Sequence, residues 1–316
     1  MTLLDIHDLK VEFHIGRETV YALRGVTMQI ERGSRTAIVG ESGSGKSVTA
    51  TSTLQLLPPT AAITGGEISF DGQDLLALSE KEIQAVRGAQ ICMIFQNAQA
   101  ALNPLYSVGS QIADIYRYHS SVGKREAWRK AVEVLQATGI PEPEDRARNY
   151  PFEYSGGMAQ RAMIAMALVS SPKLLIADEP TSGLDVTIQV QVLDLIQEIV
   201  EQLDATLVLI SHDIGIVSAI CDRIVVMYAG EVMETGTIEQ VFQTPANPYT
   251  ILLLECFTET DRQEMPYIPG RVPDLREQWQ GCSFASRCPR AQAICRQETP
   301  PVVEIGDGHF SKCHFP

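Results

Sequence analysis

The most informative part of the sequence is TAIVGESGSGKSVTA, residues 36–50. An apolar strand pattern runs directly into a glycine-rich segment, and a helical pattern begins at Ser47. Glycines in this context let the backbone curl around phosphates with its N–H groups pointing inward, and the helix N-terminus adds partial positive charge. The stretch therefore predicts a phosphate-binding loop in an α/β fold of the P-loop NTPase class.

The residues of this loop have separate predicted roles. Lys46 supplies a compact positive charge to the phosphates, and Ser47 is placed to offer its hydroxyl to Mg²⁺. ATP with Mg²⁺ is the predicted ligand. The other loop residues assigned to the nucleotide site are Gly40, Ser42, Gly43 and Gly45.

Composition limits the classes of protein to consider. The 316 residues are 45% hydrophobic and 20% charged, which is typical of a packed globular protein. With 25 basic and 39 acidic residues the net charge is −14, which repels nucleic acid and anionic lipid. The N-terminus has no signal-peptide pattern and no apolar run reaches about 18 residues. We expect a cytoplasmic protein that reaches a membrane only through partners.

The pattern along the chain predicts two domains. Short apolar runs before residue 40 and around residues 65–75 indicate an antiparallel β subdomain, and helical periodicity indicates an inserted helical subdomain at about 97–170. Strands then alternate with helical runs, as in a parallel sheet. We expect residues 1–257 to form the nucleotide-binding domain. Residues 258–316, rich in Pro, Gly, Arg and Cys, are expected to form an irregular extension.

Two adjacent carboxylates end the apolar strand LLIADE, residues 174–179. Successive side chains of a strand point to opposite faces, so the two acids cannot do the same work. We expect Asp178 to hold Mg²⁺, directly or through water, and Glu179 to orient and deprotonate the attacking water.

The sequence YSGGM, residues 154–158, lies between the loop and the acidic strand. With these motifs the chain resembles the nucleotide-binding subunits of ABC transporters over nearly its whole length. The segment resembles the family's signature loop, usually Leu-Ser-Gly-Gly-Gln, which caps the γ-phosphate held by the opposing subunit. The departures at Tyr154 and Met158 concern specificity and rate more than role. The residues implied are Ser155, Gly156 and Gly157.

Further positions match the family one by one. Gln96 resembles the glutamine that links Mg²⁺ and water to the membrane partner. Asp185 ends the segment Ser182-Gly-Leu-Asp185, which resembles the family's loop that crosses the dimer interface. His212 resembles the switch histidine that hydrogen-bonds the γ-phosphate. Phe13 is the preferred adenine-stacking residue, and Tyr21 is the alternative.

The resemblance also implies partners. Segments such as QNAQAALNPLYSVGSQI and NPYTILLL resemble the dipeptide and oligopeptide importer branch. In that branch the ATPases work as heterodimers beneath two transmembrane permease subunits, and an extracytoplasmic solute-binding protein delivers the solute. The chain is then expected on the cytoplasmic face of the inner membrane. Di- or oligopeptides are the expected solutes, and nickel or another peptide-like solute is the alternative.

Two other kinds of ABC protein are less consistent with this sequence. The soluble members that act in DNA repair resemble a domain split by a very long coiled coil, and those that act in translation resemble a tandem pair of domains in one chain. Neither feature occurs in this sequence. The presence of Glu179 and His212 argues against a degenerate subunit that binds ATP without hydrolysing it.

Four of the seven cysteines crowd into the extension. Four thiolates suffice for a tetrahedral metal centre or a cubane, which would substitute for a hydrophobic core. The spacing is wider than in zinc ribbons, and Cys288-Pro289 resembles ferredoxin-type ligation, so a 4Fe-4S cluster is preferred. Zn²⁺ and free thiols stay as alternatives. The four are Cys282, Cys288, Cys295 and Cys313.

The remaining cysteines and the nearby histidines complete the predictions. Cys92, Cys221 and Cys256 lie in apolar runs and are expected in the core. His309 and His314 flank the last cysteine and could replace a ligand, but we expect them at the surface.

Overall fold

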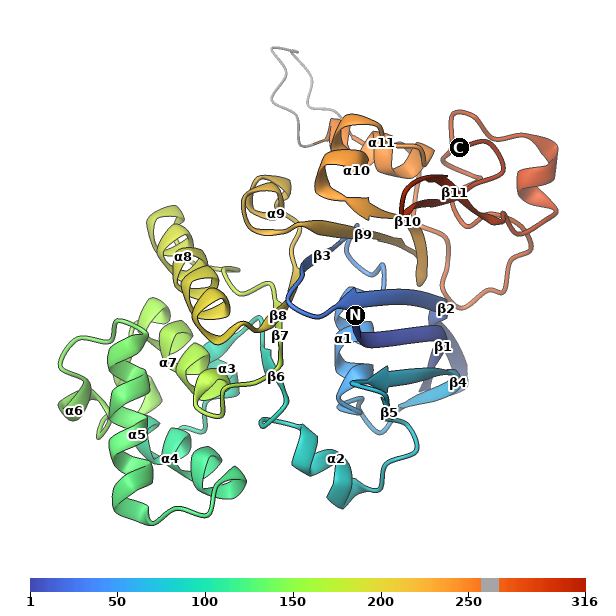
Figure 1. The fold of residues 1–316 in the computed structure, drawn as a ribbon. Helices are drawn as coiled ribbons and strands as arrows, with labels where there is room; N and C mark the ends of the chain where they lie inside the picture. The colour runs from blue at the N-terminus through green and yellow to red at the C-terminus, as the bar shows by residue number, and fades with distance from the viewer. Residues whose placement is uncertain (257–266) are drawn as a thin grey trace. The chain divides into compact units, whose positions relative to one another are not determined.

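The fold is taken from a computed structural model that describes residues 1–256 and 267–316 (Figure 1). The described chain forms two compact units, one of residues 1–77 with 209–316 and the other of residues 78–208. Strand β8 (Thr206–Ile210) carries the chain from one unit into the other. The predicted domain boundary after residue 257 lies outside the described residues, so the domain division stays a prediction.

The first unit contains the predicted antiparallel sheet. Ile6 of its central strand pairs with Met28 on one side and Ile68 on the other, and all three side chains are buried. The sheet buries one face, as alternating apolar residues dictate. Its strands, in the order β2-β1-β4-β5, are β2 (Glu18–Glu31), β1 (Thr2–Ile15), β4 (Ala61–Phe70) and β5 (Gln73–Asp74).

A second sheet in the same unit supports the phosphate-binding loop. β3 pairs in parallel with β9, and β10, β12 and β11 follow in antiparallel order. The last two strands belong to the extension, which Figure 1 draws in red beside β10. The strands are β3 (Arg35–Val39), β9 (Arg223–Tyr228), β10 (Glu231–Thr237), β11 (Val302–Gly306) and β12 (His309–Lys312).

The expectation of an irregular extension is therefore wrong for its last residues. Glu234 of β10 pairs with Ser311 of β12. Residues near the end of the chain therefore form strands because β10 offers them a neighbouring strand to pair with. The residues of β11 are half-buried or exposed. Because β11 lacks an apolar face of its own, its sequence carries no strand period.

Short helices complete this unit. Asn247 caps α11, since its side-chain oxygen accepts a hydrogen bond from the Tyr249 N–H at 3.0 Å. Pro248 then occupies the first helical position, where a missing N–H does no harm. The helices are α1 (Lys46–Thr53), α9 (Ile214–Ile220), α10 (Ile238–Gln243), α11 (Pro248–Glu255) and the 3₁₀ turn Ala293–Arg296.

The second unit joins two parallel strands to a group of helices. β6 and β7 pair in register from Ile91↔Leu174 to Ile94↔Ala177, and all these residues are buried. The stretch 97–170, predicted to be a helical subdomain, contains α3 to α7. The strands are β6 (Ile91–Ile94) and β7 (Leu174–Asp178), and the helices are α2 (Glu80–Val86), α3 (Ala98–Ala101), α4 (Val108–His119), α5 (Lys124–Ala137), α6 (Pro143–Arg146), α7 (Gly156–Leu168) and α8 (Val186–Leu203).

The polar stretch at residues 141–151 contains α6 and begins a 3₁₀ turn, Pro151–Glu153. The three cysteines expected in the core differ in burial. Cys92 and Cys221 are buried as expected, and burial raises the pKa of each thiol to about 12. Cys256 is only half-buried, because it follows the last residue of α11.

Within the two described segments, 1–256 and 267–316, no helix has both the length and the apolar content that a bilayer crossing requires.

Candidate active site

The phosphate-binding loop leaves the buried strand β3 at Gly40 and enters α1 at Lys46. Gly40 has a φ of 149°, and a Cβ there would lie 2.1 Å from the Met227 carbonyl oxygen. Gly45 has a φ of 104°, and a Cβ there would lie 2.7 Å from Leu23 Cδ2. Both positions require glycine, since a side chain would clash as well as strain the backbone. The curve of the loop is thus fixed by its contacts with β2 and β9.

Lys46 bends back over this curve. Its side chain is buried, and Nζ donates to the carbonyl oxygens of Gly40 at 2.8 Å and Glu41 at 3.0 Å. Ser47 is exposed at the start of α1. The loop therefore presents an ammonium group and a hydroxyl on consecutive residues, which suits a phosphate chain and its metal ion.

The backbone N–H and the side-chain carboxylate of Glu41 both have partners within the first unit. Its N–H donates to the Tyr249 hydroxyl at 2.9 Å, and its carboxylate contacts Arg287 of the extension at 2.6 Å. Neither partner was assigned a role from the sequence.

The acidic strand end lies in the second unit. Asp178 is buried at the end of β7, while Glu179 is half-buried and has a left-handed φ of 46°. Gln96 Nε2 donates to Glu179 Oε2 at 2.7 Å and lies 3.4 Å from the Ser182 hydroxyl. The structure thus joins the predicted base and the predicted glutamine, which are separated by 83 residues.

The signature segment begins α7 as predicted for a helix N-terminus. The Ser155 hydroxyl accepts from the Met158 N–H at 3.3 Å, so the Ser-Gly-Gly turn caps the helix. Tyr154 is buried and donates its hydroxyl to the Arg146 carbonyl at 2.9 Å, and burial raises its pKa to about 12. The departure from leucine at this position therefore anchors the turn.

A shallow pocket of the second unit brings three predicted segments together. Gln96, Gly156 and Ser182 all line it. Asp185, beyond this pocket, caps α8 by accepting from the Ile188 N–H at 3.0 Å. The other lining residues are Asn97, Ala98, Gln99, Gln160, Gly183 and Leu184.

His212 is exposed two residues after the end of β8, in the first unit. The preceding Ser211 N–H lies 3.4 Å from the Ile38 carbonyl oxygen of β3. The predicted switch histidine therefore follows a strand end beside the strand that leads into the phosphate-binding loop.

The two candidate adenine-stacking residues are both half-buried. Phe13 lies near the end of β1, opposite Val20 and Ala61. Tyr21 contacts the extension, since its N–H donates to the Leu275 carbonyl at 2.9 Å. Phe13 stays the predicted stacking residue.

Sequence comparison identifies the family of this site. The family described as ABC transporter matches residues 23–182, and the oligopeptide/dipeptide transporter C-terminal region matches residues 233–295. A probable peptide ABC transporter ATP-binding protein of Sinorhizobium fredii is 48% identical over 98% of this chain and 94% of its own length. The chain belongs to the ABC transporter ATP-binding family. It is therefore an ATPase.

Other members of the ABC family give the same result. The oligopeptide transport ATP-binding protein OppD of Bacillus subtilis is 45% identical, covering 98% of this chain and 88% of its own. The dipeptide transport ATP-binding protein DppD of Escherichia coli is 41% identical, covering 100% and 97%. A dimeric ATP-binding cassette solved with ADP and Pi has a TM-score of 0.67 at 27% identity, covering 74% of this chain and 98% of its own. The ABC ATPase fold predicted from sequence is confirmed.

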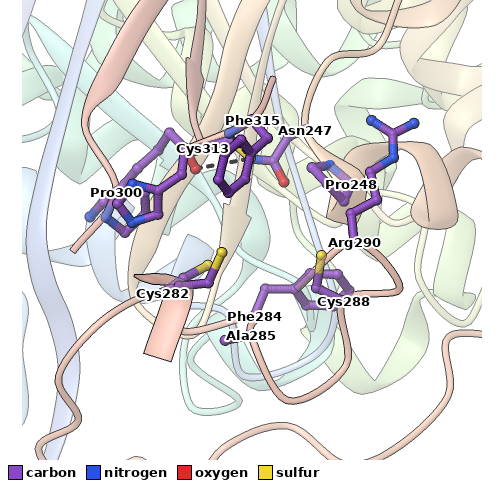
Figure 2. Close-up of a pocket in the computed structure, with 13 residues that line it drawn as sticks. Asn247, Pro248, Cys282, Phe284, Ala285, Cys288, Arg290, Pro300, Cys313 and Phe315 are labelled. Atoms are coloured by element: carbon purple, nitrogen blue, oxygen red, sulfur yellow. Dashed lines mark hydrogen bonds between the residues drawn. The ribbon is translucent and has the colours of Figure 1, made fainter. Parts of the chain in front are cut away.

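The four cysteines of the ABC ATPase extension line one cavity of about 20 Å³, room for about one water molecule (Figure 2). Cys282 N–H donates to the Cys295 carbonyl at 2.7 Å, which joins two of them through the backbone. Burial raises the pKa of the Cys282 thiol to about 11, and it raises those of Cys288 and Cys313. Among residues 1–256 and 267–316, no three His, Cys, Asp or Glu side chains are arranged to hold a metal ion.

The two histidines near the last cysteine differ. His309 is buried, contrary to expectation, and its Nε2 lies 2.7 Å from Glu234 Oε1. His314 is half-buried, lines the cysteine cavity and has Nε2 3.0 Å from the Glu298 carbonyl oxygen. His309 is therefore engaged elsewhere, while His314 lies where a substitute ligand would have to be.

Proposed function

We propose that this ABC ATPase powers the uptake of di- or oligopeptides across the cytoplasmic membrane. The observation that supports this solute class is the match of residues 233–295 to the oligopeptide/dipeptide transporter C-terminal region. Relatives named for oligopeptide and dipeptide transport match nearly the whole chain, extension included. Nickel or another peptide-like solute is the alternative.

Hydrolysis would use the residues predicted from the sequence for the nucleotide site. Lys46 and the loop amides would bind the triphosphate, while Gln96 would orient Glu179 so that its carboxylate takes a proton from the attacking water. His212 would hydrogen-bond the γ-phosphate. Bound Mg²⁺ would neutralise charge on the phosphates, and the hydroxyl of Ser47 and the carboxylate of Asp178 are the donors that suit this hard cation.

The working unit would be a dimer of ATPase subunits, of which the second is a different chain. Ser155, Gly156 and Asp185 are all exposed, as residues that complete a partner's nucleotide site must be. Val186 and Val190, one turn apart on α8, are 75% and 53% exposed, an apolar pair suited to a protein contact. ATP-driven closure of the dimer would then be transmitted from near Gln96 to two permease subunits.

The location would be peripheral, at the cytoplasmic face of the inner membrane. A helix able to span a bilayer is not found among the described residues. An extracytoplasmic solute-binding protein would deliver the solute to the permeases.

Reconstitution tests the solute class. The chain, its partner ATPase and the two permeases would be placed in liposomes with the binding protein encoded beside them. We expect ATP hydrolysis to rise when that protein is loaded with di- or oligopeptide, and radiolabelled peptide to accumulate. Stimulation by a nickel chelate and by no peptide would contradict the proposal.

We further propose that the cysteine cavity holds a 4Fe-4S cluster. Four thiols line one cavity, which is the kind and number of ligands that a 4Fe-4S cluster requires. The positively charged side chain of Arg290 also lines this cavity. In the fold described the thiols are not gathered to coordination distance. Zn²⁺, which needs less space than a cubane, is the alternative.

Metal analysis of anaerobically purified protein tests this. The cluster predicts a brown protein with broad absorbance at about 400 nm, as iron–sulfur clusters have, and about four iron atoms per chain. Substitution of Cys282 by Ser should bleach it, whereas Cys92→Ser, at a buried site outside the cavity, should not. A colourless protein with stoichiometric zinc would contradict the cluster.

A further inference from the structure

The phosphate-binding loop and the cysteine-rich extension meet in one ion pair. Arg287 Nη1 donates to Glu41 Oε2 at 2.6 Å, and Nη2 donates to Glu41 Oε1 at 2.9 Å. The arginine side chain is only 4% exposed and the glutamate 26%. Two parallel charge-assisted bonds fix orientation as well as distance. Glu41 is the second residue of the loop, and Arg287 immediately precedes Cys288.

Each of the three guanidinium nitrogens of Arg287 donates a hydrogen bond. Nε donates to the Pro269 carbonyl at 2.9 Å and Nη2 to the Ile268 carbonyl at 3.1 Å. Nη1 also donates to the Tyr228 hydroxyl at 3.2 Å. A guanidinium fixed in this way cannot swing to a second position without losing several hydrogen bonds.

The glutamate transmits this position to the loop backbone. Its N–H is held by the Tyr249 hydroxyl, and its carbonyl accepts from Lys46 Nζ at 3.0 Å. The residue that Arg287 holds is therefore one of those whose carbonyl oxygens accept a hydrogen bond from the phosphate-binding lysine.

Packing behind the loop connects the same parts. The rings of Tyr228, Tyr249 and Phe284 are almost fully buried, with centroids 4.6 to 5.2 Å apart. They come from β9, α11 and the extension. Phe284 also lines the cavity of the four cysteines. The extension thus forms part of the wall against which the loop is built.

Charge gives the pair a second effect. Glu41 would place a carboxylate in a loop that binds a highly charged polyphosphate, and like charges a few ångströms apart repel. The guanidinium neutralises that carboxylate from the side of the extension.

We propose that Arg287 is a positioning residue of the ATP site, which acts through Glu41 to hold the phosphate-binding loop in its binding curve and to neutralise the loop's own carboxylate. The extension then contributes to ATP affinity without touching nucleotide. The proposal rests on the assignment of this loop as the ATP site.

Nucleotide titration of the full chain tests the proposal. Arg287→Met should weaken ATP binding about tenfold or more, because each charge-assisted hydrogen bond is worth about one tenfold step. Arg287→Lys keeps the positive charge but cannot donate two parallel hydrogen bonds to the carboxylate, so this variant should bind ATP with intermediate affinity. In the assembled transporter Arg287→Met should raise KM for ATP and leave kcat within about threefold, since the chemistry is untouched.

Two variants provide controls. Arg276→Met removes an exposed arginine of the same extension, which contacts Glu18 and Asp274, and should leave ATP affinity within about twofold. Lys46→Ala tests the site itself. If Lys46→Ala binds ATP normally, the assignment of the ATP site fails; if it loses binding while Arg287→Met keeps parental affinity, only the role of Arg287 fails.

The double variant Glu41→Gln with Arg287→Met leaves no unpaired buried charge and is the fallback if Arg287→Met does not fold. It should bind ATP no more weakly than Arg287→Met, because both changes act through one contact. It should still bind at least about threefold more weakly than the parent. Parental affinity in the double variant, or a loss equal to the product of both single losses, would overturn the proposal.

Discussion

The backbone and the side chain of Glu179 both bear on how this acid is placed. Its backbone is left-handed, with a φ of 46°, a conformation that seven other non-glycine residues of the described chain share. Gln96 then holds the carboxylate at 2.7 Å. The hydrogen bond from Gln96 thus helps to orient the half-buried acid, as a group that must orient a water molecule requires.

Glu179→Gln should lower ATP turnover in the assembled transporter by about 10² or more, because a positioned general base contributes about that much. The amide cannot accept a proton at neutral pH, yet it keeps the shape and the contact with Gln96. Turnover is measured as phosphate release at saturating ATP, with ATP affinity measured separately.

Glu198→Gln is the matched control. Glu198 is exposed on α8 and lies outside the pocket that Gln96 lines, so turnover should not change. Turnover of Glu179→Gln within about threefold of the parent would show that another group takes the proton.

Elements are joined by a buried polar network at the edge of the second sheet. The Glu234 carboxylate of β10 accepts from the N–H groups of Ala246 and Asn247 at 2.8 and 3.0 Å and lies 2.7 Å from His309 Nε2 of β12. Asn247 in turn donates to the carbonyls of Met233 and Lys312. One carboxylate therefore ties β10, the start of α11 and the end of the extension.

Glu234→Gln should destabilise the fold by about 2 kcal/mol, because the new amide nitrogen cannot accept a hydrogen bond and leaves one buried N–H unsatisfied. The effect would be seen as a lower urea midpoint in equilibrium unfolding. Glu239→Gln, at an exposed position of α10, should change the free energy of unfolding by less than about 0.5 kcal/mol. Equal midpoints for the two variants would exclude the network as the anchor.

At the scale of the whole molecule, the extension is part of the first unit rather than an appendage. It supplies β11 and β12 to the second sheet, and its Arg276 contacts Glu18 of β2. Arg287 reaches the phosphate-binding loop. The extension, which the sequence predicts to need a metal in place of a hydrophobic core, therefore also contacts the phosphate-binding loop.

The parts of this protein that consecutive residues encode can be predicted from the amino-acid sequence. The loop at residues 40–47, the acids at 178–179 and the helix start at Ser155 each depend on neighbours in the chain, so their spacing reports their geometry. The alternation of strands and helices likewise gave the α/β class, because hydrophobic period is local.

The contacts between distant segments become visible in the folded chain alone. Arg287 and Glu41 are 246 residues apart, and no local pattern distinguishes this arginine from its neighbours. His309 looked like a surface residue until β12 paired with β10 and placed it against Glu234. The physical reason is that burial and ion pairing depend on which surfaces meet in the folded chain. The spacing of side chains along the sequence does not say which distant segments will meet.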